Sequence, residues 1–168
     1  MNYRNTTIVL DTYNQNNRKS GYVNTRIRCP FVTTNEFIFS IASENAFSHA
    51  GKIFGLKDIE INNAKFDNEF YLKSRHEDKL LLFLNSEIIQ KTYLEFAKNE
   101  IIGLEIRVTD DRPFFSLQTN PSKVFWICCE KINLESNIEI LKSWFNLCKL
   151  TLDRLIEIGE AEDVSPNF

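Results

Sequence analysis

Charged side chains that could bind a ligand occur together in two segments. Arg26 and Arg28 alternate with apolar residues in a predicted strand, so both guanidinium groups point to one face. Asp110, Asp111 and Arg112 follow one another in a predicted turn. Binding groups gather on sheet faces and hairpin tips, although arginines also suit the solvated face of a half-buried strand and aspartates suit turns. The structural interpretation is the simpler one, and these residues are the binding candidates that the sequence offers.

The histidines and glycines give no support for catalysis or nucleotide binding. His49 and His76 have no carboxylate or cysteine at a spacing typical of acid–base catalysis. The 5 glycines are scattered, and none belongs to a phosphate-binding loop. We therefore predict no catalytic residue and no cofactor, and the sequence favours a protein that is not an enzyme.

The 4 cysteines lack the spacing of a metal site. Cys128 and Cys129 are adjacent in a predicted strand and point to opposite faces, whereas Cys29 and Cys148 lie in other elements. Zinc-binding cysteines usually occur as C-x-x-C pairs joined by a tight turn. We expect all of these thiols to be free and buried, with no metal, as in proteins of a reducing compartment.

Length and charge narrow the classes of protein further. The chain has 168 residues, enough for one domain with a sizeable core. Its formal net charge of -3 provides no broad basic field for a phosphate backbone, so we expect no nucleic-acid partner. The longest apolar stretches, Leu80–Leu84 and Val124–Cys129, are far shorter than the roughly 20 residues of a membrane-spanning helix. With no signal peptide near Met1, the sequence predicts a cytoplasmic protein that is not an integral membrane protein.

The first part of the chain is predicted to form short strands. Thr7–Tyr13 is rich in β-branched residues and predicts a strand at the edge of a sheet. A second strand, Asn24–Cys29, is expected to end at Pro30, which lacks a backbone donor. A turn at Thr33–Asn35 is followed by apolar residues at alternate positions, which predict another strand. Thr25–Ala42 is therefore predicted to form a hairpin.

The central part is predicted to mix helices and strands. We expect a helix at Glu44–Phe54, short strands at Lys57–Ile61 and Glu69–Lys73, and helices at His76–Leu84 and Ser86–Ala97. The first helix of this pair is apolar nearly all round at Leu80–Leu84, so we expect it to be well covered. After Gly103, three consecutive strands predict a meander, with Phe114–Thr119 as the middle strand and Lys123–Lys131 as the last.

The clearest element is a C-terminal helix. Ser136 and Glu139 form a capping box, and apolar residues recur at three-four spacing over Ile138–Leu155. We expect a helix of roughly 22 residues that ends near Gly159. Phe145, in the middle of the apolar stripe, should pack against the protein's own sheet, with pairing to a second chain as the alternative.

Several segments of the chain resemble a family of uncharacterised bacterial proteins. These segments are Arg28–Val32, Gly51–Glu60, Phe66–Phe70 and Leu152–Gly159. The resemblance extends over about residues 25–159, which is most of the domain. It implies a bacterial domain that is sometimes part of longer membrane-associated proteins, and it implies no activity and no catalytic residue.

Together these elements predict an α+β fold. We expect a mostly antiparallel sheet of roughly six to eight strands, covered on one face by the long C-terminal helix and the central helix pair. The order of elements is similar to helix-grip and TATA-binding-protein arrangements, an analogy that transfers no function. Residues 1–24 are predicted to form a strand and a polar loop, residues 25–159 a single α+β domain, and residues 160–168 an acidic tail that frays.

The function that this sequence favours is a non-catalytic binding or protein-interaction module. No catalytic motif is found, and the second face of the predicted sheet is available for binding. The alternative is a small-ligand carrier or an enzyme with a cavity between the sheet and the C-terminal helix. The partner is then an unidentified protein or small ligand, and a monomer is favoured over a homodimer.

Overall fold

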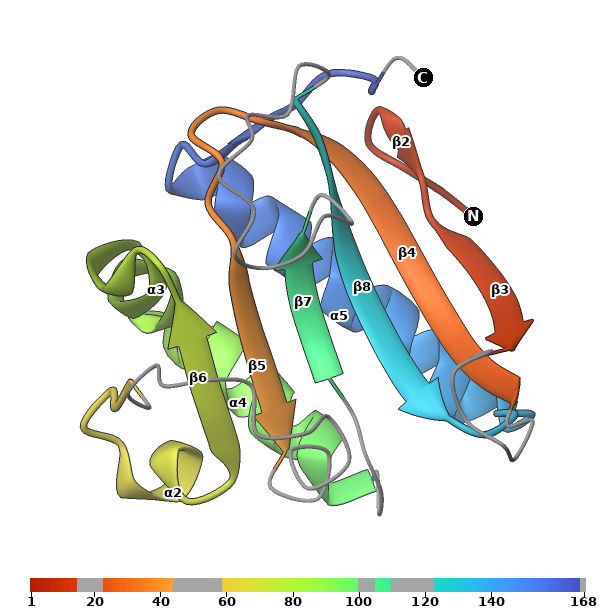
Figure 1. The fold of residues 1–168 in the computed structure, drawn as a ribbon, viewed down its shortest axis with the longest axis horizontal. Helices are drawn as coiled ribbons and strands as arrows, with labels where there is room; N and C mark the ends of the chain where they lie inside the picture. Colours follow the sequence, from red (N-terminus) through yellow and green to blue (C-terminus); the bar gives the residue numbers. More distant parts are fainter. Residues whose placement is uncertain (15–22, 44–58, 100–104, 110–122, 167–168) are drawn as a thin grey trace.

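One antiparallel sheet organises the fold. The computed structural model describes residues 1–14, 23–43, 59–99, 105–109 and 123–166, and the statements below concern these residues. The strands of the sheet are β3 (Val9–Asn14), β4 (Val23–Thr33), β5 (Phe39–Ser43), β6 (Phe70–Ser74), β7 (Glu105–Thr109), β8 (Val124–Ile132) and β9 (Ala161–Glu162). Their order in this seven-stranded sheet is β3-β4-β8-β7-β5-β6, and β9 pairs with β4 off this path (Figure 1).

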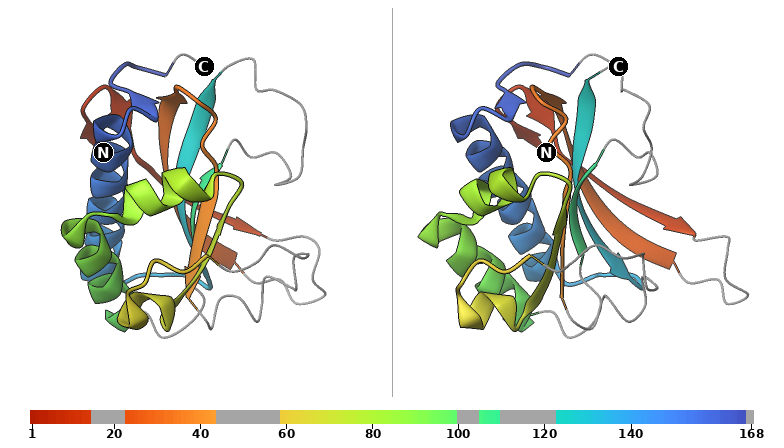
Figure 2. Two further views of the ribbon diagram at one scale, coloured as in Figure 1. Left: turned by 90° about the vertical axis from the view of Figure 1, so that its left-hand side faces the viewer. Right: turned by 60° about the vertical axis from the view of Figure 1, so that its left-hand side comes forward.

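Three helices cover one face of the sheet. They are α3 (Glu77–Leu84), α4 (Glu87–Asn99) and α5 (Ile138–Glu157), and a shorter helix, α2 (Ala64–Asp67), precedes β6. Figure 2 shows α3, α4 and α5 on the same side of the sheet. The predicted α+β fold is therefore confirmed, together with the central helix pair and the long C-terminal helix.

The α3 helix is buried on one side only. Its residues Leu80, Phe83 and Leu84 are buried, whereas Leu81 and Leu82 are exposed. A helix that packs on a sheet in a single layer leaves its outer side in solvent. The prediction that this helix is well covered is therefore wrong for its outer side, where Leu81 and Leu82 lie.

The hydrophobic core fills the space between the sheet and α5. Alternate residues of β4, Ile27, Cys29 and Phe31, are buried on the helix side of the sheet. Trp144 and Leu155 of α5 are fully buried in the same cluster. Removal of these side chains from water holds α5 on the sheet.

Asn137, and not Ser136, caps the N-terminus of α5. The Asn137 side chain accepts a hydrogen bond from the backbone N–H of Glu139 at 3.0 Å. Asparagine is as good an N-cap as serine, so the predicted capping box is wrong by one residue. At the other end, Gly159 has a φ of 77°, in the left-handed region that terminates helices, and the predicted end of α5 is confirmed.

The β4 strand continues through Pro30. The Pro30 carbonyl accepts a hydrogen bond from the Thr6 hydroxyl at 2.7 Å, which places the backbone polar groups of Pro30 on the side away from β8. The missing N–H therefore does not interrupt the pairing with β8, in which Pro30 lies opposite Trp126. The prediction that the strand ends at Pro30 is wrong for this reason.

The order of strands also differs from the prediction. The β5 strand pairs with β6 and β7, and β8 separates β7 from β4, so the predicted Thr25–Ala42 hairpin is wrong. The β7 and β8 strands pair directly with each other, and no middle strand of a meander lies between them. Phe114–Thr119 and Glu44–Phe54 lie outside the described residues.

Residues 59–61 are held by α2 and belong to no strand. The Asp67 carboxylate accepts hydrogen bonds from the backbone N–H groups of Ile61 and Asn63 at 2.9 and 3.0 Å. Only Ile59 donates a backbone hydrogen bond to β6, at 3.2 Å. The predicted strand Lys57–Ile61 is therefore wrong in its described part, whereas β6 confirms the strand predicted after it.

Both ends of the described chain pack beside β4. Strands β1 (Asn2–Tyr3) and β2 (Thr6–Thr7) form a separate two-stranded sheet. Arg4 forms ion pairs of 2.7 Å with Asp153 and Asp163, which join this hairpin to α5 and to the C-terminal segment. Glu160 is buried and forms an ion pair of 2.9 Å with Lys79, and β9 pairs with β4 directly after it. The expectation that the tail frays is therefore wrong for residues 160–162.

Candidate functional site

The face of the sheet opposite α3, α4 and α5 carries most of the charged side chains of the central strands. We call it the distal face. Strand register places Arg28, Cys128 and Arg107 side by side on β4, β8 and β7. The neighbouring row on the same face contains Asp11 and Arg26 of β3 and β4. The site side chains discussed below are Asp11, Tyr13, Asn24, Arg26, Arg28, Arg107, Trp126 and Glu130.

One carboxylate holds two arginines on the distal face. Asp11 accepts two hydrogen bonds from Arg26, each of 3.1 Å, through the Nε and Nη2 atoms of the guanidinium. It also accepts a hydrogen bond of 2.6 Å from Nη2 of Arg28. The two-point contact fixes the plane of the Arg26 guanidinium, since a fork of two donors meets both carboxylate oxygens. Asp11 therefore links the edge strand β3 to two positions of β4.

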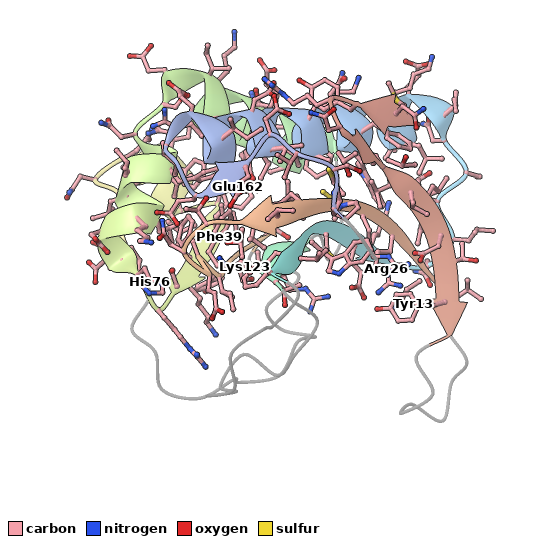
Figure 3. The ribbon with its side chains drawn as sticks, turned by 90° about the horizontal axis from the view of Figure 1, so that it is seen from above. Tyr13, Arg26, Phe39, His76, Lys123 and Glu162 are labelled. Atoms are coloured by element: carbon pink, nitrogen blue, oxygen red, sulfur yellow. The ribbon has the colours of Figure 1, made fainter. Side chains whose placement is uncertain are left out.

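Each of these arginines also lies over an aromatic ring. The guanidinium carbon of Arg26 is 4.7 Å from the centre of the Tyr13 ring, and that of Arg28 is 4.9 Å from the centre of the Trp126 ring. Figure 3 shows Tyr13 and Arg26 beside each other on the side of the sheet away from α5. A cation over an aromatic face is attracted by the ring quadrupole. The two arginines are thus fixed by a carboxylate at one side and a ring at the other.

A second carboxylate, Glu130 of β8, extends this network across the sheet. It accepts a hydrogen bond of 2.9 Å from Nη2 of Arg107 and one of 3.3 Å from the side-chain amide of Asn24. The Tyr13 hydroxyl also donates to Glu130. Because Tyr13 contacts both Arg26 and Glu130, the network is continuous from β3 to β7. Among the described residues, the buried atoms Nε of Arg28 and Oδ1 of Asn24 have no hydrogen-bond partner.

The ionisation of the network follows from these contacts. Burial alone would raise the pKa of Asp11, but the hydrogen bonds and positive charges of Arg26 and Arg28 outweigh it, and the pKa lies below its ordinary value. Burial and the hydrogen bond to Glu130 raise the pKa of Tyr13. Asp11 is therefore ionised and Tyr13 neutral near neutral pH, which is the state that both sets of contacts need.

We expect Asp11→Asn to lower the free energy of unfolding by about 1 kcal/mol near neutral pH, because charge-assisted hydrogen bonds to two arginines are lost and the site is partly exposed. A carboxylate whose pKa is lower in the folded state stabilises the fold above its unfolded-state pKa. This stabilisation is lost as the pH falls through the folded-state pKa. Urea unfolding of the parent and of Asp11→Asn across the acidic range should therefore show a difference that shrinks toward low pH. A difference that does not change with pH would contradict the role of the Asp11 charge.

The sequence identified part of this site. Arg26 and Arg28 lie together on the distal face, as the alternating pattern indicated. Asp110, Asp111 and Arg112 lie outside the described residues. Sequence reasoning missed Asp11, Tyr13, Arg107, Trp126 and Glu130. The available signal was the alternation of Asp11 with Tyr13 in the first strand, which places both on one face.

All of the cysteines are free and buried, as predicted. Cys128 lies on the distal face between Arg28 and Arg107, whereas Cys129 and Cys148 lie in the core with their sulfur atoms 3.5 Å apart. The hydrogen bond with Cys129 and burial raise the pKa of Cys148, and burial raises the pKa of Cys29 to about 12. The thiols of Cys29 and Cys148 are therefore protonated near neutral pH. Within the described ranges, no group of three or more metal-ligating side chains is found.

Buried side chains occupy the interface where the alternative hypothesis places a ligand cavity. Trp144, Leu147 and Cys148 of α5 are fully buried in one cluster with Ile27 and Ile127 of the sheet. A close-packed interface of this kind has no room for a ligand unless the helix moves. The carrier or enzyme with a cavity in this interface stays a prediction, and the distal face is the candidate site.

Comparisons with known proteins add no assignment to this geometry. No family model, no curated protein and no solved structure matches the chain. The resemblance to a bacterial family therefore stays a prediction. None of the helices in the described part of the chain has both the length and the apolar character needed to cross a membrane.

Proposed function

We propose that this chain is a non-catalytic protein-interaction module and that the distal face is its binding surface. The observation that carries the proposal is the pair of arginines, Arg26 and Arg28, each stacked on an aromatic ring and both bound to Asp11. Arginine, tyrosine and tryptophan are the residue types that contribute most to binding at protein interfaces. Here they are gathered on neighbouring strands of one sheet face.

The network supports binding because it fixes side chains before a partner arrives. A free arginine loses much rotamer freedom on binding, and this loss weakens association. Arg26 and Arg28 are already held in place. Their side chains are still 19% and 24% exposed to solvent, so they can contact a partner. Because the face presents both guanidinium and carboxylate groups, it fits a polar protein surface of mixed charge.

The same contacts argue against acid–base catalysis on this face. A general base needs a pKa close to the working pH and a free lone pair beside the proton that it removes. The pKa of Asp11 is lowered by two arginines, and Glu130 accepts hydrogen bonds from Arg107, Asn24 and Tyr13. Carboxylates engaged in this way are suited to fixing arginines.

A double variant tests the distal face. We expect Arg26→Gln with Arg28→Gln to weaken binding of a captured partner by about tenfold or more, because two fixed interface cations are removed. Lys91→Gln with Lys142→Gln is the control, since it also removes two positive charges, from exposed positions on the helix side. The partner is captured from cell extract with the parent chain, identified by mass spectrometry and titrated against the parent and both variants by calorimetry.

The controls make this test decisive. Urea unfolding of both double variants must show cooperative transitions, which establishes that each is folded. Equal affinity of the parent and the arginine variant would refute the distal face as the binding surface. Equal weakening by the lysine control would show that overall charge, and not this face, governs binding.

A further inference from the structure

The β3 strand is the last strand on its side of the sheet. It pairs with β4 along one edge, from Val9 opposite Arg28 to Asn14 opposite Val23. On its other edge, Ile8 exchanges two backbone hydrogen bonds of 2.8 Å with Met1. Beyond Ile8, none of the described residues pairs with this outer edge of β3.

The backbone of β4 shows which groups of β3 point outward. The Pro30 carbonyl accepts from Thr6 on the β3 side, whereas the Thr33 N–H donates to the Lys123 carbonyl on the β8 side. Backbone polar groups alternate along a strand. Even-numbered residues of β4 therefore direct their N–H and C=O groups toward β3.

The same alternation applies to β3 itself. Val9 lies opposite Arg28 and Asp11 opposite Arg26, so Val9 and Asp11 exchange hydrogen bonds with β4. The N–H and C=O groups of Leu10 and Thr12 then point away from the sheet. These are the groups that an added strand would bind.

The outer edge of β3 has neither the proline nor the lysine that often protects an edge strand. Val9 and Leu10 are 39% and 43% exposed. The opposite edge of the sheet, at β6, receives a backbone hydrogen bond from Ile59, and the edge of β4 beyond β3 is paired with β9. On the outer edge of β3, the backbone groups of Leu10 and Thr12 have no strand partner among the described residues.

A second copy of the chain does not fit this edge well. In an antiparallel pair of two β3 strands, a residue at the two-fold axis lies opposite its own copy. An axis at Asp11 would therefore place two Asp11 carboxylates opposite each other, and like charges in this position repel. An axis at Leu10 pairs only the residues from Val9 to Asp11, and an axis at Thr12 pairs only those from Leu10 to Asn14. In addition, a strand of 6 residues spans about 20 Å, an edge too short to bury the roughly 1,200 Å² of a stable dimer.

We infer that β3 binds an extended segment of a partner protein by strand addition, through the outward backbone groups of Leu10 and Thr12. The segment alternates apolar residues beside Leu10 with hydroxyl or amide residues beside Asp11. An acidic residue there would face Asp11, and a basic residue would meet the two arginines that Asp11 already binds. This edge uses backbone groups and does not depend on the partner of the distal face.

A displayed library of short peptides that alternate apolar and hydroxyl-bearing positions tests the inference on the full chain. The selected peptide should slow hydrogen exchange at the Leu10 and Thr12 amides in NMR spectra. Thr12→Pro removes one outward donor and leaves the pairing of β3 with β4 intact, so we expect about tenfold weaker binding. Thr12→Ser keeps the donor and should bind as the parent does. Leu10→Lys adds a charge at the edge and should also weaken binding of the peptide. If Thr12→Pro does not fold, the affinity of Leu10→Lys tests the inference in its place.

Four results would overturn the inference. One is a selection that yields no binding peptide, and another is slowed exchange confined to other amides. A third is unchanged affinity in the folded Thr12→Pro or Leu10→Lys variant. The last is a concentration-dependent dimer that protects the Leu10 and Thr12 amides without peptide, which would make a second copy the occupant.

Discussion

Trp144→Ala is expected to lower the free energy of unfolding by about 3–5 kcal/mol, a large part of the roughly 5–15 kcal/mol that stabilises a typical domain. Trp144 is the largest of the fully buried side chains in the core. Its ring lies edge-on to Phe96 of α4, with 6.4 Å between ring centres. The truncation would leave a cavity where α4 and α5 meet, and the surrounding side chains cannot close it fully.

Phe145→Ala is the matched control for this prediction. Phe145 is the next residue of α5, but it is only partly buried at the margin of the core. Urea unfolding of both variants should show a clearly larger loss for Trp144→Ala. Losses of equal size, or a larger loss for Phe145→Ala, would contradict the orientation of α5 on the sheet.

The helical pattern predicted α5 well but selected the wrong central side chain. Periodicity gave the length of the helix, its end at Gly159 and the buried residues Cys148 and Leu155. It also favoured Phe145, because neighbouring stripes on a helix differ by the rotation of a single residue, and two large aromatic side chains adjoin here. The position of the sheet decides between them, and that position is not present in local sequence.

The strand order could not be predicted for a related reason. A short connection between β4 and β5 indicated a hairpin, since consecutive strands usually pair. In the structure β8 and β7, which come much later in the chain, lie between them. Pairing of distant strands depends on the whole arrangement of the sheet and leaves no local signal comparable to a turn motif.

The candidate site shows the same division between local and distant information. Alternation in one strand placed Arg26 and Arg28 on a common face. Their partner Asp11 comes from another strand, and the Glu130–Arg107 pair comes from β8 and β7, two central strands of the sheet that come much later in the chain. A sequence can therefore indicate which residues face solvent, whereas the network that fixes them follows from strand order.

A pair of buried hydroxyl groups joins α4 to α5. Tyr93 Oη and Thr151 Oγ1 lie 2.9 Å apart, and both residues are fully buried. Burial raises the pKa of Tyr93 well above its ordinary value, so the phenol stays protonated in the folded protein near neutral pH. The two hydroxyl groups therefore satisfy each other in the core between the two helices.

Thr151→Val should lower the free energy of unfolding by about 1–3 kcal/mol, because the Tyr93 hydroxyl is left buried without this partner. Tyr93→Phe should be milder, since a helical threonine can turn its hydroxyl to the carbonyl one turn earlier in α5. With both hydroxyl groups removed, neither is left unpaired, so the double variant should lose less than the sum of the single losses. Urea unfolding near neutral pH measures all three. Additive losses would show that the two hydroxyl groups do not interact, and the contact between α4 and α5 would then rest on apolar packing alone.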